Sequence, residues 1–113
     1  MIPFNNFKLH YNSIKPVVDE AISRVLNSGW FVLGNEVKNF EAAFSKYLNA
    51  KYCVGVASGT EAITLSLMSY DIGVDDEVIT TNLTAFPTIT GIVQSGATPV
   101  VVDIFEEDGL IDY

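Results

Sequence analysis

Val54-Gly55-Val56-Ala57-Ser58-Gly59-Thr60-Glu61-Ala62 is the stretch that decides the fold of this chain. Its first part continues an apolar, partly β-branched run from Cys53, which is typical of a strand covered on both faces. The apolar residues that recur at helical spacing after it are Ile63, Leu67 and Tyr70. The sequence therefore predicts a strand at about Tyr52–Ala57, a turn of small residues, and a helix that begins near Thr60.

The turn Ser58-Gly59-Thr60 has two interpretations. A helix N-terminus exposes unpaired backbone N–H groups and the positive end of the helix dipole, which together favour a bound anion such as phosphate. Gly59 would let the anion approach closely, and the hydroxyls of Ser58 and Thr60 could donate to it. Ser58 and Glu61 equally fit a capping box that binds nothing. The turn matches neither the nucleotide P-loop nor the three-glycine dinucleotide motif.

Composition restricts the classes of function. A chain of 113 residues suits one small domain, and its 49% of hydrophobic residues favours a piece of a large α/β core. A net charge of −8 with only six basic residues argues against a nucleic-acid partner. The single histidine, His10, supports neither a histidine-based triad nor a metal site, and the lone Cys53 is expected to be a buried thiol. No signal segment or membrane-spanning run is visible, so we expect a cytoplasmic protein with no membrane partner.

Hydrophobic periodicity predicts an alternation of helices and strands. The elements expected outside the opening stretch are helices at Ser13–Asn27, Asn35–Leu48 and Ala85–Gln94 and strands at Glu77–Thr81 and Thr98–Asp103. Met1–Tyr11 is expected to be irregular, and Pro16 fits the first turn of the first helix. Such an alternation argues for an α/β fold with parallel strands joined by crossovers.

Four stretches together resemble the DegT/StrS-type sugar aminotransferases, which are pyridoxal-phosphate (PLP) enzymes of the aspartate-aminotransferase fold. They occur in the family's order and spacing and are Ser28–Val37, Val54–Ala62, Asp76–Thr80 and Gly96–Asp103. The resemblance implies the N-terminal part of the PLP-binding large domain of fold type I. Residues 1–113 would form a single partial domain, with the N-terminal helices and the first three strands of an incomplete parallel sheet.

The resemblance also implies roles for particular residues. Ser58, Gly59 and Thr60 look like the turn that binds the phosphate of pyridoxal 5′-phosphate. Trp30 and Phe31 look like part of the loop that lines the nucleotide-sugar site near a dimer interface. Plain core packing is the alternative for each of these two rings.

The helix that opens at Thr84-Ala85-Phe86-Pro87-Thr88 looks like the family's segment that places an aromatic ring over the cofactor. Many members carry the ring where this chain has Ala85, so Phe86 is the candidate cofactor contact. A shift of one residue turns a helical side chain by about 100°, and ordinary burial of Phe86 is the alternative. This variant of the segment resembles some members that act on 3-keto sugars.

The family implies a homodimeric enzyme that moves an amino group from an amino acid such as glutamate to a nucleotide-linked keto-deoxysugar, in polysaccharide or secondary-metabolite biosynthesis. PLP chemistry needs a Schiff-base lysine and an acid at the pyridine nitrogen. In the family both follow the third strand, so we expect no catalytic residue in residues 1–113 and no activity of this chain alone.

Two alternatives remain open at this point. One is a PLP-dependent sugar dehydratase or another fold-type-I PLP enzyme, because the fold does not set the reaction. The other is a non-catalytic module that binds a phosphorylated ligand. Since the remaining strands of the sheet are expected beyond this sequence, we also predict that the isolated chain aggregates or folds only in part.

Overall fold

The computed structural model describes residues 4–112. The chain divides into two compact units, one up to Gly55 and one from Val56 onwards, and each is described by itself. The single partial domain expected from the resemblance stays a prediction. In the part of the chain that is described, no helix has both the length and the apolar character needed to cross a membrane.

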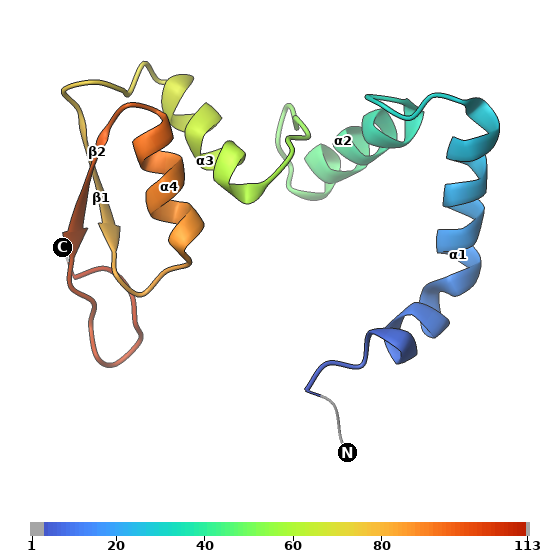
Figure 1. Cartoon of the computed structure of the whole chain (residues 1–113), viewed down its shortest axis with the longest axis horizontal. Coiled ribbons are helices and arrows are strands. Elements are labelled where there is room, and N and C mark those ends of the chain that lie inside the picture. Colours follow the sequence, from blue (N-terminus) through green and yellow to red (C-terminus); the bar gives the residue numbers. More distant parts are fainter. Residues whose placement is uncertain (1–3, 113) are drawn as a thin grey trace. The chain divides into compact units, whose positions relative to one another are not determined.

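The first unit contains two helices, α1 (Phe7–Ser28) and α2 (Asn35–Tyr47) (Figure 1). Helix α2 confirms the helix predicted at Asn35–Leu48, whereas α1 begins before the predicted start at Ser13. Its start is set by Asn6, whose side chain accepts a hydrogen bond from the Leu9 N–H at 3.0 Å. Such a cap satisfies one of the unpaired donors of the first turn.

The prediction of an irregular segment at Met1–Tyr11 is therefore wrong from Phe7 onwards, and Met1–Pro3 lie outside the described residues. Pro16 lies inside α1 and not in its first turn. A proline in a helix interior removes one backbone hydrogen bond and commonly bends the helix. Figure 1 shows α1 changing direction in its N-terminal part.

The second unit contains α3 (Gly59–Met68), β1 (Glu77–Thr81), α4 (Phe86–Gln94) and β2 (Thr98–Val102). The two strands pair in parallel, with Glu77 opposite Thr98 and Thr81 opposite Val102. This confirms both strands and their predicted parallel pairing, with α4 as the crossover between them. Helix α4 packs against α3 and β2 (Figure 1).

Helices α3 and α4 approach so closely that position 91 requires a glycine. A Cβ atom on Gly91 would lie 2.9 Å from the Ile63 Cβ atom and 2.9 Å from the Thr60 carbonyl oxygen. The Thr64 hydroxyl donates to the Gly91 carbonyl at 3.0 Å, which ties the two helices together. The neighbouring Ile92 is 2% exposed and belongs to the small core of this unit.

One predicted strand is absent from the structure. Tyr52–Ala57 has no regular secondary structure, so the prediction of a strand there is wrong for this chain. A strand exists only through hydrogen bonds to a neighbouring strand, and the sheet within residues 4–112 contains β1 and β2 alone. Cys53 in this segment is partly buried, not fully buried as predicted.

Large apolar side chains remain exposed in both units. Tyr47 and Phe40 on α2 are 82% and 56% exposed, and Val101 on β2 is 54% exposed. The buried apolar side chains within residues 4–112 are those of Ile92 and Ala97. The aggregation of the isolated chain stays a prediction, and these exposed side chains are the surfaces through which it would occur.

Candidate functional site

The N-terminus of α3 is capped by its own turn. Ser58 is the N-cap, and its hydroxyl oxygen accepts a hydrogen bond from the Glu61 N–H at 3.1 Å. The Glu61 carboxylate accepts from the Ala57 N–H at 2.7 Å, one residue before the usual partner in a capping box. The predicted cap is therefore present, in a form that leaves other donors of the turn unused.

Two of these unused donors are the N–H groups of Gly59 and Thr60. Residues in the first turn of a helix find no acceptor within the helix, and no other acceptor in residues 4–112 reaches these two groups. A Cβ atom on Gly59 would meet nothing within 4 Å, so the space beside this turn is open. The positive end of the α3 dipole adds to the attraction of an anion.

The turn accordingly suits a bound phosphate group. It offers two free backbone donors, an open approach at Gly59, and the hydroxyls of Ser58 and Thr60. The negative charge of Glu61 opposes an anion, but its carboxylate already binds the Ala57 N–H. The assignment of Ser58, Gly59 and Thr60 to a cofactor phosphate stays a prediction that this geometry permits.

Phe86 lies in the same unit as this turn, at the first position of α4. Ala85 before it is the N-cap residue, with an extended backbone and no side-chain cap. The Phe86 ring is 80% exposed, so it is open to a partner and does not pack in the core of this unit. Its contact with the cofactor stays a prediction.

Trp30 lies in the first unit, in the loop between α1 and α2. Gly29 ends α1 with a left-handed backbone, at a φ of 65°. The Ser28 hydroxyl oxygen then accepts from the Trp30 N–H at 3.1 Å. A Cβ atom on Gly34 would lie 2.9 Å from the Trp30 carbonyl oxygen, so the loop closes tightly on that carbonyl.

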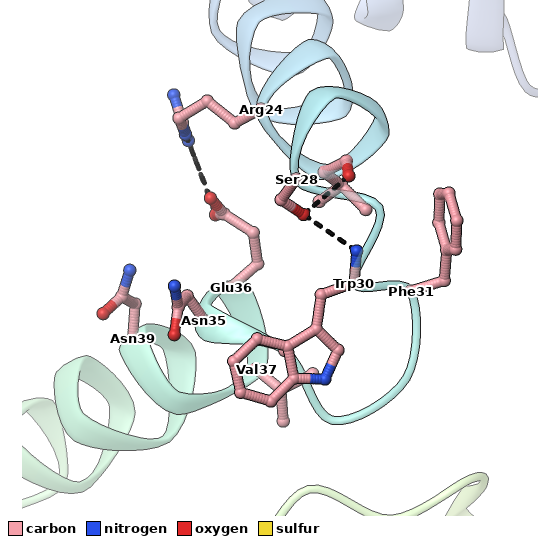
Figure 2. A pocket seen from close by; sticks show the side chains of 10 residues that line it. Arg24, Ser28, Trp30, Phe31, Asn35, Glu36, Val37 and Asn39 are labelled. Carbon is pink, nitrogen blue, oxygen red and sulfur yellow. Dashed lines mark hydrogen bonds and ion pairs between the residues drawn. The ribbon is translucent and has the colours of Figure 1, made fainter.

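This loop forms one wall of a pocket of about 430 Å³ (Figure 2). The Trp30 ring is 49% exposed, and the Lys38 ammonium lies 4.9 Å from its centroid, as in a cation–π contact. Phe31 also lines the pocket, but Figure 2 shows its ring pointing away from Trp30. The polar residues of the lining are Arg24, Ser28, Asn35, Glu36 and Asn39.

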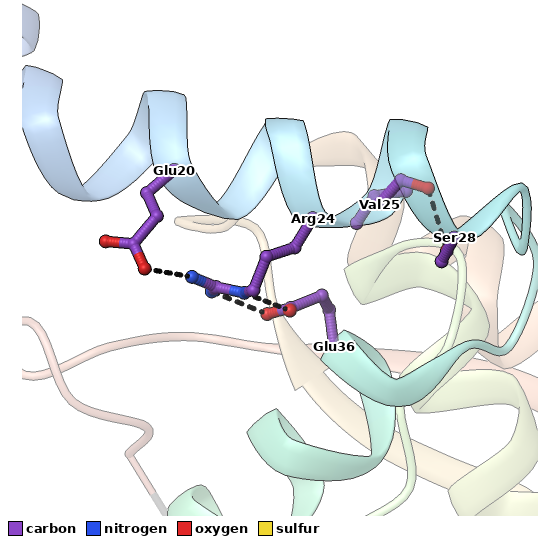
Figure 3. Close-up of polar contacts among 5 residues, drawn as sticks. All are labelled: Glu20, Arg24, Val25, Ser28 and Glu36. Carbon is purple, nitrogen blue, oxygen red and sulfur yellow. Dashed lines mark hydrogen bonds and ion pairs between the residues drawn. The ribbon is translucent and has the colours of Figure 1, made fainter.

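An arginine joins the two helices at the wall of this pocket (Figure 3). The Arg24 Nε atom donates to Glu36 Oε1 at 3.0 Å, and its Nη2 atom donates to Glu36 Oε2 at 3.4 Å. A third donor, Nη1, binds Glu20 Oε1 at 3.1 Å. The hydrogen bond from Arg24 lowers the pKa of the Glu36 carboxyl, and the same bond raises the pKa of Arg24.

Sequence patterns give no signal for the contact between Arg24 and Glu36. The two residues are 12 positions apart across a loop, which matches no helical spacing. A glutamate in the first turn of a helix is also ordinary, because it faces the positive end of the dipole. Among residues 4–112, no group of three or more histidine, cysteine or acidic side chains could hold a metal ion.

Comparisons with known proteins agree with this fold. The chain is 46% identical over 103 residues to dTDP-3-amino-3,6-dideoxy-alpha-D-galactopyranose transaminase of Aneurinibacillus thermoaerophilus, covering 91% of this chain and 28% of that protein. It superposes on the crystal structure of S. venezuelae DesV in complex with a ketimine intermediate, with a TM-score of 0.93 and 39% identity, over 98% of this chain and 30% of that one.

A dehydratase is among the similar structures as well. The E. coli GDP-4-keto-6-deoxy-D-mannose-3-dehydratase with bound hydrated PLP matches with a TM-score of 0.74 and 31% identity, over 82% of this chain and 25% of that one. The chain thus spans less than a third of the length of these relatives. The model of the DegT/DnrJ/EryC1/StrS aminotransferase family matches residues 12–113. This chain therefore belongs to the DegT/DnrJ/EryC1/StrS aminotransferase family.

Proposed function

We propose that this chain is the N-terminal part of a PLP-dependent aminotransferase that acts on a nucleotide-linked keto-deoxysugar. The amino group would come from an amino acid such as glutamate. The name of the Aneurinibacillus relative, a 3-amino-sugar transaminase, supports C3 as the carbon that is aminated. The observation that carries the proposal is the pair of free N–H groups at Gly59 and Thr60 beside open space.

In this proposal the chain binds the cofactor and orients it. The Gly59 and Thr60 amides and the Ser58 hydroxyl hold the phosphate of PLP, and the Phe86 ring covers one face of the cofactor. When bound, PLP supplies an electron sink for moving a proton and an amino group. We propose that the lysine that this chemistry needs is supplied from outside residues 1–113.

The remaining parts of the proposal concern the substrate and the setting. Trp30 and Phe31 bind the nucleotide sugar from the loop between α1 and α2. The intact enzyme works as a homodimer in the cytoplasm and supplies amino sugars for surface polysaccharide, including lipopolysaccharide, or for secondary metabolites. The names of the relatives support the class of substrate, and family membership supports the cofactor.

A Gly59→Ala substitution in the intact protein that carries this chain tests the phosphate site. A methyl group at position 59 meets no atom of this chain within 4 Å, and alanine favours a helix over glycine. The fold should therefore be as stable as before, whereas the methyl group obstructs a phosphate and should weaken PLP binding about tenfold. A Ser66→Ala variant on the exposed part of α3 serves as control. Unchanged PLP affinity in Gly59→Ala, measured by absorbance titration, would contradict the site.

The reaction itself is tested by the product. The intact protein, loaded with PLP and incubated with glutamate and a dTDP-linked 3-keto-6-deoxysugar, should yield the 3-amino sugar, detected by mass spectrometry. The similarity to the GDP-4-keto-6-deoxy-D-mannose-3-dehydratase supports a second candidate, a sugar dehydratase. With a 4-keto-6-deoxysugar substrate, that enzyme would give a product that has lost the C3 hydroxyl and gained no nitrogen.

A further inference from the structure

We infer that Arg24 is a positioning residue for the nucleotide sugar: its ion pair with Glu36 fixes the loop that presents Trp30 to the substrate. This inference rests on the proposed function, in which Trp30 binds the substrate. Arg24 would act through the loop and would not itself touch the sugar nucleotide.

The first step of the argument is how the loop is held. The Trp30 N–H binds the Ser28 hydroxyl oxygen at 3.1 Å on the α1 side. On the α2 side, Gly34 lies against the Trp30 carbonyl. Among residues 4–112, the pair between Arg24 and Glu36 is the only side-chain hydrogen bond that joins α1 to α2. It therefore ties α1 to α2 across the base of the loop that carries Trp30.

The second step is why an arginine stands at this position. A guanidinium presents a planar fork of donors that matches both oxygens of a carboxylate, which an ammonium cannot do. Glu36 offers both oxygens, and Glu20 on the same helix as Arg24 holds a third donor (Figure 3). The two bonds to Glu36 fix the direction from which the guanidinium holds α2, whereas the bond to Glu20 stays within α1.

The third step separates this role from direct binding of a diphosphate. Three Arg24 nitrogens already donate to carboxylates, and the two negative charges of the glutamates exceed its single positive charge. An arginine that served as phosphate ligand would bind better after removal of a competing carboxylate. An arginine that positions the loop would lose its effect when Glu36 is neutralised. The two roles therefore predict opposite results for the same substitution at Glu36.

The experiment is steady-state kinetics on the intact protein that carries this chain, with Arg24→Gln, Glu36→Gln and the double variant. Exposed ion pairs contribute modestly, so KM for the nucleotide sugar should rise about three- to fivefold in each single variant. The double variant should be no worse than either one, and kcat should stay within about twofold. Arg24→Lys should raise KM less than Arg24→Gln does, but KM should stay above that of the natural protein. Glu20→Gln neutralises the other glutamate that binds Arg24, which lies on α1 and makes no link to α2. This control variant should leave KM unchanged.

A second readout does not depend on activity. The emission of Trp30, obtained as the difference between the protein and its Trp30→Phe variant, should be quenched by acrylamide about twofold more strongly in Arg24→Gln and in Glu36→Gln. Unchanged quenching would overturn the inference, whether or not the intact protein has aminotransferase activity. Absence of that activity would contradict the proposed function, but it would not decide the role of Arg24. A higher KM in Arg24→Gln with a lower KM in Glu36→Gln would also overturn it and make Arg24 a substrate ligand.

Discussion

Replacement of Gly91 by alanine should loosen the contact between α3 and α4. The added Cβ atom would lie 2.9 Å from both the Ile63 Cβ atom and the Thr60 carbonyl oxygen, distances that Cβ atoms do not adopt. One of these neighbours is backbone and the other is fixed to backbone, so no side-chain rotation relieves the overlap. The two helices must move apart to make room.

The magnitude follows from two opposing effects. Forcing an additional methyl group into a close contact costs about 1–3 kcal/mol. Alanine in place of glycine within a helix recovers about 0.5–1 kcal/mol. With the middle of each range, the free energy of local opening falls by about 1.25 kcal/mol, which corresponds to an opening constant raised about eightfold.

Hydrogen–deuterium exchange of the intact protein measures this local opening directly. Peptides from α3 and α4 should exchange faster in Gly91→Ala by the factor given above, while peptides from α1 and α2 should not change. Ser66→Ala, on the exposed part of α3, makes a helix-favouring change without an overlap and should leave exchange unchanged or slower. Exchange in Gly91→Ala that is equal to or slower than in the natural protein would refute the reasoning.

Two further predictions concern charged groups. Glu61→Gln should leave α3 intact, because the amide oxygen of the glutamine still accepts from the Ala57 N–H. The substitution removes a negative charge beside the phosphate and should raise PLP affinity about twofold to fivefold. Weaker binding in a PLP titration would mean that the charge itself orders the turn. Because Arg24 lowers the pKa of Glu36, the contribution of this pair to stability is complete above the ordinary glutamate pKa and is lost as the pH falls through the lowered value. Urea denaturation of the natural protein and of Arg24→Gln should therefore differ at neutral pH and converge in acid, and a difference that grows in acid would contradict the assignment.

Local signals in the sequence were sufficient for much of the second unit. The β-branched runs at Glu77–Thr81 and Thr98–Val102 and the helical stripe between them predicted β1, α4 and β2, because each of these elements finds its partner within a short stretch of chain. The Ser58 cap was predictable for the same reason, since Ser58 and the Glu61 N–H group that donates to it lie three residues apart. The role of the turn in binding PLP follows from family resemblance and not from this local pattern.

Two of the failures share one physical cause, which is dependence on groups far away in the chain. Tyr52–Ala57 has the composition of a strand, but composition cannot supply the neighbouring strand that it needs. The ion pair between Arg24 and Glu36 is a tertiary contact between two helices, so no periodicity in the sequence predicts it. The early start of α1 has a local cause. Asn6 is a favoured residue type for a helix N-cap, but the mixed composition of the N-terminal segment led to the prediction of an irregular structure there.

The parallel pair of β1 and β2 also bears on how the protein folds during its synthesis. Thr98 lies 21 residues after its partner Glu77 (98 − 77 = 21), and α4 occupies the connection. Closing a connection of this length costs little chain entropy, so this pairing forms faster than contacts between distant segments. The β1–α4–β2 segment can therefore assemble soon after it leaves the ribosome, with one unpaired edge on each strand available as a template for further strands.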